Sequence, residues 1–366
     1  MAFFSVPADF LTTTLDVYAE MNRKYAHKIE GTYGQLTQGF HSNSGRALHM
    51  LPTVDKFKLE QYIQHSRNNN MDFNYTLNAT CLGNAEFRHS EALALYRFLD
   101  ELYELGVRSI TIAMPSLLEL ARAYYGKFDI RASTLCTIDT PNKARWFREQ
   151  GIRRMVVDEM ANRDFQALQS MAGISDQLEL IVNSVCHNQC VYRHFHQNQA
   201  AHYSEIDDIS TYYLHRCMLQ RTRTPGDWMR LCWIRPEDIP YYTDIGIHHF
   251  KIQGRQAVLH GDIIRCVKSY LSEEWNGNLL DLLNCFYTQN SFPFYLDNKL
   301  ADGFIQPFMS SHFQCIHDCE SCGYCDTFAK RCMDIQTVAE NNQLAQAYYS
   351  SYDEYRILLT DFQNQH

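Results

Sequence analysis

The sequence predicts an α/β fold, a (β/α)8 TIM-type barrel with a cysteine-rich C-terminal appendage. Eight short apolar segments alternate with amphipathic helical patterns over roughly 250 residues, the usual length of such a barrel. Cysteines and cationic residues follow the later segments, and barrel sites lie on the loops after the strands. The alternative is a doubly wound open sheet, but no Gly-x-Gly-x-x-Gly follows an early strand, so dinucleotide binding has no motif.

A leading helix is expected in residues 1–27, before the barrel begins. Apolar side chains recur there at near-helical spacing, at Phe10, Leu11, Leu15, Tyr18 and Met21. The barrel is then expected to run from residue 28 to residue 275.

The expected strands are short apolar runs, many of them rich in β-branched residues. They lie at residues 28–33, 72–78, 109–113, 130–136, 154–157, 178–182, 230–234 and 249–252. Helical patterns separate them at residues 54–67, 90–105, 117–125, 141–150 and 164–171, and a long amphipathic helix is expected at 256–274. The connection between the sixth and seventh strands, residues 183–229, is far longer than the few residues usual in α/β units, which favours a functional role.

Residues 276–366 are expected to form a C-terminal extension. Its first part is rich in Asn, Phe and Tyr without a clear period, and a cysteine motif and a terminal helix at about 335–359 follow. We expect this extension to pack on the barrel rather than form a long independent domain.

The overall charge limits the class of partner. The chain has 366 residues, a formal net charge of -9 and a pI of about 6.0. Such a chain is ill suited to an extended nucleic-acid-binding face, so RNA is a less favoured partner than a small molecule or peptide. The first residues lack a basic region followed by a sustained apolar core, and no run reaches the ~18 apolar residues of a membrane span. We therefore expect a cytoplasmic protein without membrane contact.

The most specific motif is Cys315-x3-Cys319-x2-Cys322-x2-Cys325. In a cytoplasmic protein these thiols are expected to be reduced. Four closely spaced thiolates can enclose a tetrahedral metal or hold a cubane cluster, and the spacing favours zinc and iron–sulfur equally. A structural zinc site that fastens the C-terminal segment to the barrel is the simpler alternative to a functional centre.

A second set of thiols comprises Cys186, Cys190 and Cys217, which lie in the long connection after the sixth strand. Three thiolates would leave one iron of a cubane cluster open to substrate, unless a fourth ligand comes from elsewhere. The alternative is a buried thiol pair and an unrelated loop cysteine.

Cationic residues are expected at two neighbouring strand ends. Arg235 closes the expected seventh strand, and Lys251 and Arg255 follow at the end of the eighth. Cations at the strand ends of a barrel bind carboxylate or phosphate groups, so these residues are predicted to hold an anionic part of the substrate. The alternative is a salt-bridged rim, with Glu237 or Asp238 as the acidic group.

Further polar residues follow the earlier strands. Glu30, near the end of the expected first strand, and Arg46, soon after it, are predicted to add a carboxylate and a guanidinium to the catalytic site. Asn78 and Asn183 end the second and sixth strands, where amide hydrogen bonds can orient a bound cofactor or ligand.

Several blocks occur in a specific order: EGTYG, SGR, the Asn-x-x-Cys-x-x-x-Cys end of the sixth strand, IRPEDIPYY, FKIQGR and the late CxxxCxxCxxC. In that order they resemble the U32 peptidase family, also called collagenase-like proteases, from about residue 28 to 330. The resemblance implies a barrel core. Several relatives are iron–sulfur proteins of oxygen-independent hydroxylation, so the resemblance implies this activity here as well. These relatives act in ubiquinone biosynthesis or on RNA bases, and for the RNA-modifying ones prephenate is the implied oxygen source.

The resemblance also implies ligands. Cys186, Cys190 and Cys217 fall where the family places cluster ligands, so a [4Fe-4S] cluster is implied, and the C-terminal motif suggests a second centre. Two departures stand out. The first two cysteines are separated by three residues where many relatives have six, and the relatives' fourth cysteine falls near Pro240, which cannot bind iron.

Three functions follow from these observations. The first is an iron–sulfur enzyme that hydroxylates or otherwise modifies a small-molecule, peptide or RNA substrate without dioxygen. The second is a U32-type peptidase, although the sequence contains neither Gly-x-Ser-x-Gly nor His-Glu-x-x-His. The third is a non-catalytic iron–sulfur subunit that pairs with another chain of the same family.

Overall fold

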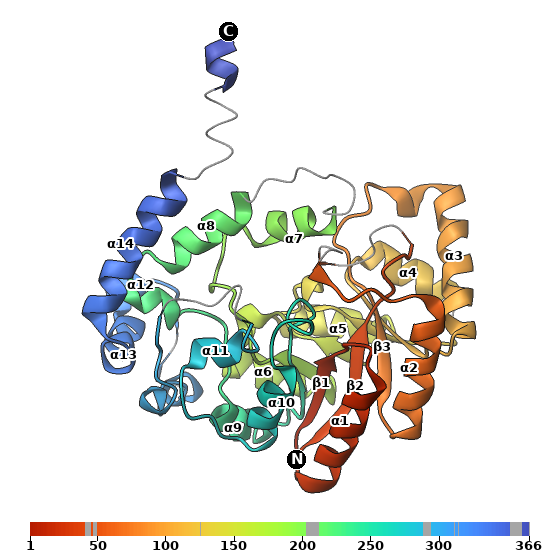
Figure 1. Ribbon diagram of the computed structural model, residues 1–366, viewed down its shortest axis with the longest axis horizontal. Helices are drawn as coiled ribbons and strands as arrows, with labels where there is room; N and C mark the ends of the chain where they lie inside the picture. The colour runs from red at the N-terminus through yellow and green to blue at the C-terminus, as the bar shows by residue number, and fades with distance from the viewer. Residues whose placement is uncertain are drawn as a thin grey trace.

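The computed structural model contains a closed barrel of eight parallel strands in the order β1 to β8 (Figure 1). It describes residues 1–40, 45–46, 50–124, 126–202, 212–287, 294–310, 312–313, 315–351 and 361–365. The (β/α)8 fold predicted from the alternating pattern is thereby confirmed. The strands are β1 Phe3–Pro7, β2 Lys28–Gly34, β3 Asp72–Leu77, β4 Ser109–Ile112, β5 Asp129–Ala132, β6 Arg154–Val156, β7 Gln177–Ile181 and β8 His249–Lys251.

Helices cover the outside of the barrel and continue into two additions. The barrel helices are α1 Thr12–Lys24, α2 Lys56–Asn68, α3 His89–Glu104, α4 Pro115–Tyr124, α5 Pro141–Glu149, α6 Phe165–Ala172, α9 Ile239–Thr243 and α10 Ile263–Leu271. The long connection after β7 carries α7 Arg193–Ala201 and α8 Tyr212–Arg221, and the C-terminal extension carries α11 Leu279–Leu283, α12 Cys319–Cys322, α13 Tyr324–Cys332 and α14 Ile335–Ser351. Residues 352–359 of the expected terminal helix lie outside the described residues. Among the described helices, none is both long and apolar enough to cross a membrane.

The expected boundary at residue 28 is wrong, because the barrel begins with β1. This strand pairs with β2 on one side and β8 on the other and so closes the barrel. The expected seventh strand, residues 230–234, is not a barrel strand. Its amides bond instead to the chain leaving β7, with Cys232 N donating to Cys186 O and Ile234 N to Val182 O. An apolar run that is buried in this way has the same sequence pattern as a strand.

The interior of the barrel is polar, whereas its outer face is apolar. Inside, Ser5 Oγ donates to Glu179 at 2.6 Å, and Asn74 bonds to side chains of the neighbouring strand β4. The outward residues, such as Phe4 and Phe250, are fully buried under the helices. A charged side chain inside the barrel needs a partner there, because an unpaired buried charge is costly. An interior charge without such a partner therefore points to a functional role.

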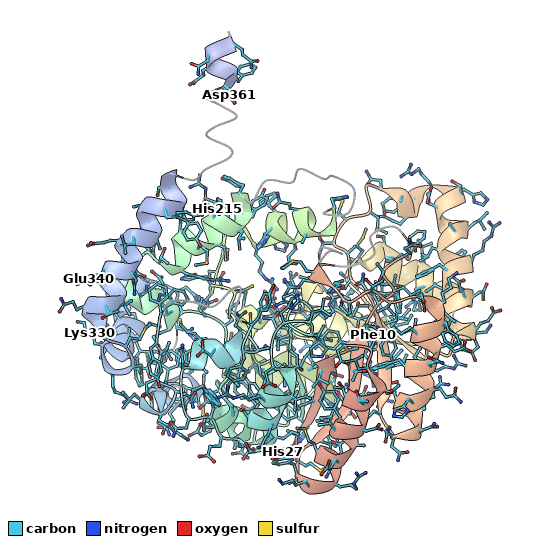
Figure 2. The ribbon with its side chains drawn as sticks, viewed as in Figure 1. Phe10, His27, His215, Lys330, Glu340 and Asp361 are labelled. Atoms are coloured by element: carbon cyan, nitrogen blue, oxygen red, sulfur yellow. The ribbon has the colours of Figure 1, made fainter. Side chains whose placement is uncertain are left out.

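The C-terminal extension packs against the addition that follows β7. Gln346 of α14 donates to the Leu219 carbonyl of α8 at 2.8 Å, and the rings of His215 and Tyr349 lie 5.3 Å apart. Figure 1 shows α14 lying beside α8, and Figure 2 places the labelled His215 at this junction, far from Phe10 and His27 at the barrel. The two cysteine-bearing additions are therefore neighbours in the fold.

Candidate functional site

Two cysteine-bearing segments, far apart in sequence, meet beside the C-terminal end of the barrel. Asn188, between Cys186 and Cys190, lies with its amide nitrogen 3.3 Å from the ring nitrogen Nδ1 of His317. His317 lies between the first two cysteines of the C-terminal motif. One segment leaves β7 and the other precedes α12, so the contact brings both sets of thiols to one region.

A chain of buried ion pairs holds these segments together. His187 Nε2 lies 3.0 Å from Asp227 Oδ1, and Arg230 donates to the same carboxylate oxygen at 2.8 Å. Arg230 also pairs with Asp326 on α13. Hydrogen bonds from His187, Arg230 and Thr224 outweigh the effect of burial and lower the pKa of the Asp227 carboxyl group. The connection after β7 is thus fastened electrostatically to the cysteine-rich extension.

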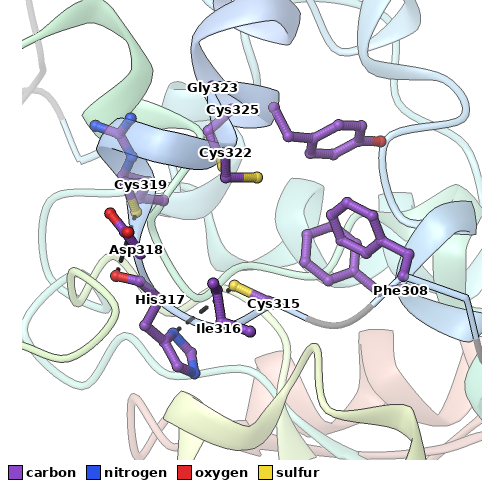
Figure 3. A pocket seen from close by; sticks show the side chains of 12 residues that line it. Phe308, Cys315, Ile316, His317, Asp318, Cys319, Cys322, Gly323 and Cys325 are labelled. Atoms are coloured by element: carbon purple, nitrogen blue, oxygen red, sulfur yellow. Dashed lines mark hydrogen bonds between the residues drawn. The ribbon is translucent and has the colours of Figure 1, made fainter.

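The four C-terminal cysteines line one open pocket of about 330 Å³. Figure 3 shows Cys315 and His317 on one side of it and Cys319 and Cys322 on the other. Gly323, with φ of +61°, makes the turn between α12 and α13 that a side chain would strain, and this turn lets residues on both helices face the pocket. The other lining residues are Arg230, Phe308, Phe313, Ile316, Asp318, Gly323, Tyr324 and Cys325.

The surroundings of these thiols differ in polarity. Burial raises the pKa of Cys325 to about 11 and also raises the pKa of Cys319. A hydrogen bond from His317 lowers the pKa of Cys315, whose sulfur lies 3.8 Å from His317 Nδ1. No three His, Cys, Asp or Glu side chains of the described residues are already gathered as ligands around one point. Four thiols line the same pocket, and thiolates are the donors that zinc and iron–sulfur clusters use, so metal binding here stays a prediction.

The second set of thiols lies at the exit of β7 and on α8. Cys217 is close enough to Cys186 and Cys190 for its charge to raise the pKa of both, in addition to the larger effect of burial. Burial raises the pKa of Cys186 to about 12. Beside them Arg193 pairs with Asp158 at 2.8 Å and with Glu159 at 2.9 Å. The charge of Cys217 thus reaches both other thiols, but the described residues do not gather the three cysteines around one point, and their shared role as ligands stays a prediction.

Arg235 does not lie at the barrel mouth. Its guanidinium donates to both oxygens of Asp238 at 2.8 and 3.0 Å, and to Asp302 and the Asn298 carbonyl at 2.7 Å each. Arg235 is 2% exposed. The expectation of an anion-binding residue is wrong because the preceding segment is not a barrel strand, and the salt-bridged alternative with Asp238 describes the structure.

Lys251 and Arg255 do lie at the C-terminal end of the barrel. The Lys251 ammonium is 3.7 Å from the centroid of the Tyr33 ring, and Arg255 donates to Gln35 at 2.8 Å and to Thr76 at 3.0 Å. Burial lowers the pKa of Lys251 to about 8 and the pKa of Arg255 to about 10. Arg46 is near enough for its charge to contribute to the lowered pKa of Arg255. The charges of Lys251 and Arg255 thus interact with each other, and those of Arg255 and Arg46 do so as well.

The other expected site residues are used by the fold. Glu30 lies within β2 and accepts hydrogen bonds from both terminal nitrogens of Arg154, and its carboxylate is 3.0 Å from His249 Nδ1. Asn183 Nδ2 donates to the Gln253 and Leu283 carbonyls at 2.7 and 3.1 Å. Glu30 and Asn183 are thus held by hydrogen bonds within the fold, and these contacts do not test the catalytic and ligand-binding roles expected of them.

Asn78 has an indirect position in the site. Its side-chain oxygen accepts from the Gly45 amide at 3.2 Å, which fixes the residue next to Arg46. Asn78 therefore holds the backbone next to Arg46, and no structural contact tests its expected role in ligand binding.

Sequence reasoning missed one pair of residues near the barrel mouth. Cys81, in the loop after β3, accepts a hydrogen bond from the Gly83 amide at 3.4 Å, and His202 also bonds to this thiol. These two bonds, that of Gly83 first, lower the pKa of the Cys81 thiol. Cysteine and histidine are 121 positions apart in the sequence (202 − 81), so only the fold reveals the pair.

One family model and several known proteins match this chain. The family model described as peptidase family U32 matches residues 53–279. The uncharacterized protease MJ1657 of Methanocaldococcus jannaschii is 28% identical over 343 residues, which are 92% of this chain and 100% of that protein. The solved structure of the U32 peptidase Mk0906 has a TM-score of 0.50 and 17% identity and covers 69% of this chain and 92% of that one. At this identity the structural likeness shows the fold alone.

Proposed function

The chain belongs to peptidase family U32, and from this premise we propose that it is an iron–sulfur enzyme that modifies a small anionic substrate without dioxygen. Oxygen-independent hydroxylation is the reaction proposed. The observation that carries the proposal is the contact between the connection after β7 and the cysteine-rich extension. Through this contact, seven thiols lie in two neighbouring groups beside the barrel end where Lys251 and Arg255 converge.

The two groups of thiols have different proposed roles. Cys315, Cys319, Cys322 and Cys325 would hold a closed centre, because four protein ligands complete a cubane cluster or a zinc site. Cys186, Cys190 and Cys217 would hold a centre with one open iron position. A cluster bound there supplies a Lewis acid and an electron carrier.

The protein's own residues would bind and orient the substrate. Lys251, Arg255 and Arg46 form a cluster of positive charge that favours a carboxylated molecule, such as a prephenate-like oxygen donor. Arg255 is fixed by Gln35 and Thr76, so its charge is held in one position before substrate arrives. The net charge of -9 makes a large RNA substrate less suitable than a small molecule or a peptide.

Anaerobic purification tests this proposal. We expect brown protein with broad visible absorption that contains both iron and acid-labile sulfide. Colourless protein with stoichiometric zinc and no iron, before and after anaerobic reconstitution, would overturn it.

A peptidase is the second candidate function. The names of MJ1657, an uncharacterized protease, and of the U32 peptidase Mk0906 favour it. In addition, Cys81 with His202 offers a thiol with a lowered pKa beside an imidazole. If the chain is a peptidase of this kind, Cys81→Ala should abolish cleavage of denatured collagen. Cys136→Ala, which removes a half-buried thiol bonded to the Ala113 carbonyl, should leave cleavage intact. Cleavage that survives Cys81→Ala would exclude this nucleophile.

A further inference from the structure

Lys251 is the last residue of β8, at the end of the barrel where barrel enzymes place their reacting groups. Interior arginines of the same barrel are paired, Arg154 with Glu30 and Arg131 with Asp72. Lys251 is not. Within the residues that the structure describes, no carboxylate lies within ion-pair distance of its ammonium group, whose contact is with the face of the Tyr33 ring.

The surroundings of Lys251 disfavour its protonated form. Burial has the largest effect, and the charges of Arg131, Arg255 and Arg154 act in the same direction, while Glu179 opposes them. With a pKa of about 8 rather than 10.5, the share of neutral amine at neutral pH is about three hundred times that of an ordinary lysine. A neutral, partly buried amine is the form of lysine that attacks carbonyl carbon.

We propose that Lys251 is a nucleophile that forms an imine with a 2-oxo acid bound at the barrel mouth. The positive charge of Arg255 and Arg46 would hold the carboxylate, which in a 2-oxo acid is adjacent to the reacting carbonyl. This inference rests on the proposed use of the barrel mouth as the substrate site, but it requires no metal.

The reaction is a condensation without an oxidant or reductant. The Lys251 nitrogen lone pair forms a bond to the carbonyl carbon, and the carbonyl oxygen takes up a proton while the nitrogen loses one, which gives a carbinolamine. The hydroxyl group takes up one proton from the solvent and departs as water, with the nitrogen lone pair forming the second carbon–nitrogen bond, which leaves a protonated imine. Its positive charge beside the carboxylate would activate the neighbouring carbon atoms of the substrate.

Reductive trapping tests the proposal. The protein is incubated with pyruvate and sodium cyanoborohydride, which reduces an imine to a stable secondary amine, and the modified lysine is located by peptide mass mapping. Lys251 should acquire a carboxyethyl group at least about tenfold faster than Lys56, an exposed lysine in the same digest. Lactate, which lacks the carbonyl group, should give no adduct and should compete with pyruvate.

Controls separate this inference from the cluster proposal. Trapping is repeated on protein stripped of metal by a chelator, where the Lys251 adduct should persist, whereas Lys251→Arg should lose it. The inference would be overturned if Lys251 reacts with neither pyruvate nor phenylpyruvate, or if it reacts no faster than Lys56. The wild-type peptide map alone decides this if the variant does not fold. Iron content is unaffected by that outcome, so failure here is distinguishable from failure of the iron–sulfur proposal.

Discussion

Replacing Arg235 by glutamine should destabilise the protein and leave the barrel mouth intact. The change removes both bonds to Asp238, which is 1% exposed, and the bond to the Asn298 carbonyl. An uncompensated buried carboxylate costs about 3–5 kcal/mol. The bond to Asp302 adds little, because that side chain is 62% exposed and exposed pairs contribute about 0–1 kcal/mol.

Equilibrium urea unfolding followed by circular dichroism measures this cost. Arg235→Gln should lower the free energy of unfolding by about 3–5 kcal/mol and Asp302→Asn by no more than about 1 kcal/mol. Arg223→Gln is the matched control, since Arg223 is 66% exposed and lies 3.6 Å from Asp227, and it should change stability by less than about 1 kcal/mol. Trapping of pyruvate at Lys251 should be unchanged in all three. An Arg235→Gln protein as stable as the wild type, or one that loses trapping while stable, would refute this assignment.

Three further changes test other parts of the structure. Glu30→Gln should lower the free energy of unfolding by about 3–5 kcal/mol near neutral pH, because it leaves Arg154 unpaired. The fold lowers the pKa of Glu30, so the stability that its charge contributes is present above the unfolded pKa and is lost as pH falls. The stability of the variant should therefore fall less steeply than that of the wild type below about pH 5. Gly226→Ala should destabilise the packing of the extension by about 1–3 kcal/mol, since the added Cβ would lie 2.0 Å from Asp326 Oδ1. Proteolysis after Tyr324 should then be faster than in the wild type, and an unchanged rate of cleavage would contradict this expectation. Cys322→Ala should lower both metal content and melting temperature, because bound metal contributes to folding, and an unchanged value of both would argue against a C-terminal centre.

The barrel could be predicted from the sequence, but one of its strands was missed and one expected strand is not part of it. β1 has only five residues, FFSVP, and precedes a helix with a clear apolar period. The sequence pattern therefore assigns these residues to the expected leading helix. The run at residues 230–234 is as apolar as a strand, yet its amides bond to the chain leaving β7. Hydrogen-bonding partners distinguish these cases, and local sequence does not specify them.

The candidate site was predictable where neighbours in sequence or strand ends determine it. Spacing placed four cysteines in one pocket, and the end of β8 placed Lys251 at the barrel mouth. The role of Arg235 depends on Asn298 and Asp302, which lie more than sixty residues later, and so the sequence could not settle it. The ammonium of Lys251 likewise contacts Tyr33, which lies near the start of the barrel sequence, so local sequence does not specify the surroundings of this lysine.

The most direct test of the iron–sulfur proposal is the iron and acid-labile sulfide bound per chain after anaerobic reconstitution. It should be measured for the wild type, Cys217→Ala and Cys322→Ala. Two neighbouring centres predict that the wild type holds iron and sulfide and that each variant loses a different part of both, with Cys217→Ala keeping its melting temperature. A wild-type protein without iron and sulfide would contradict the proposal, and loss of all iron from Cys217→Ala would show that the seven thiols serve a single centre.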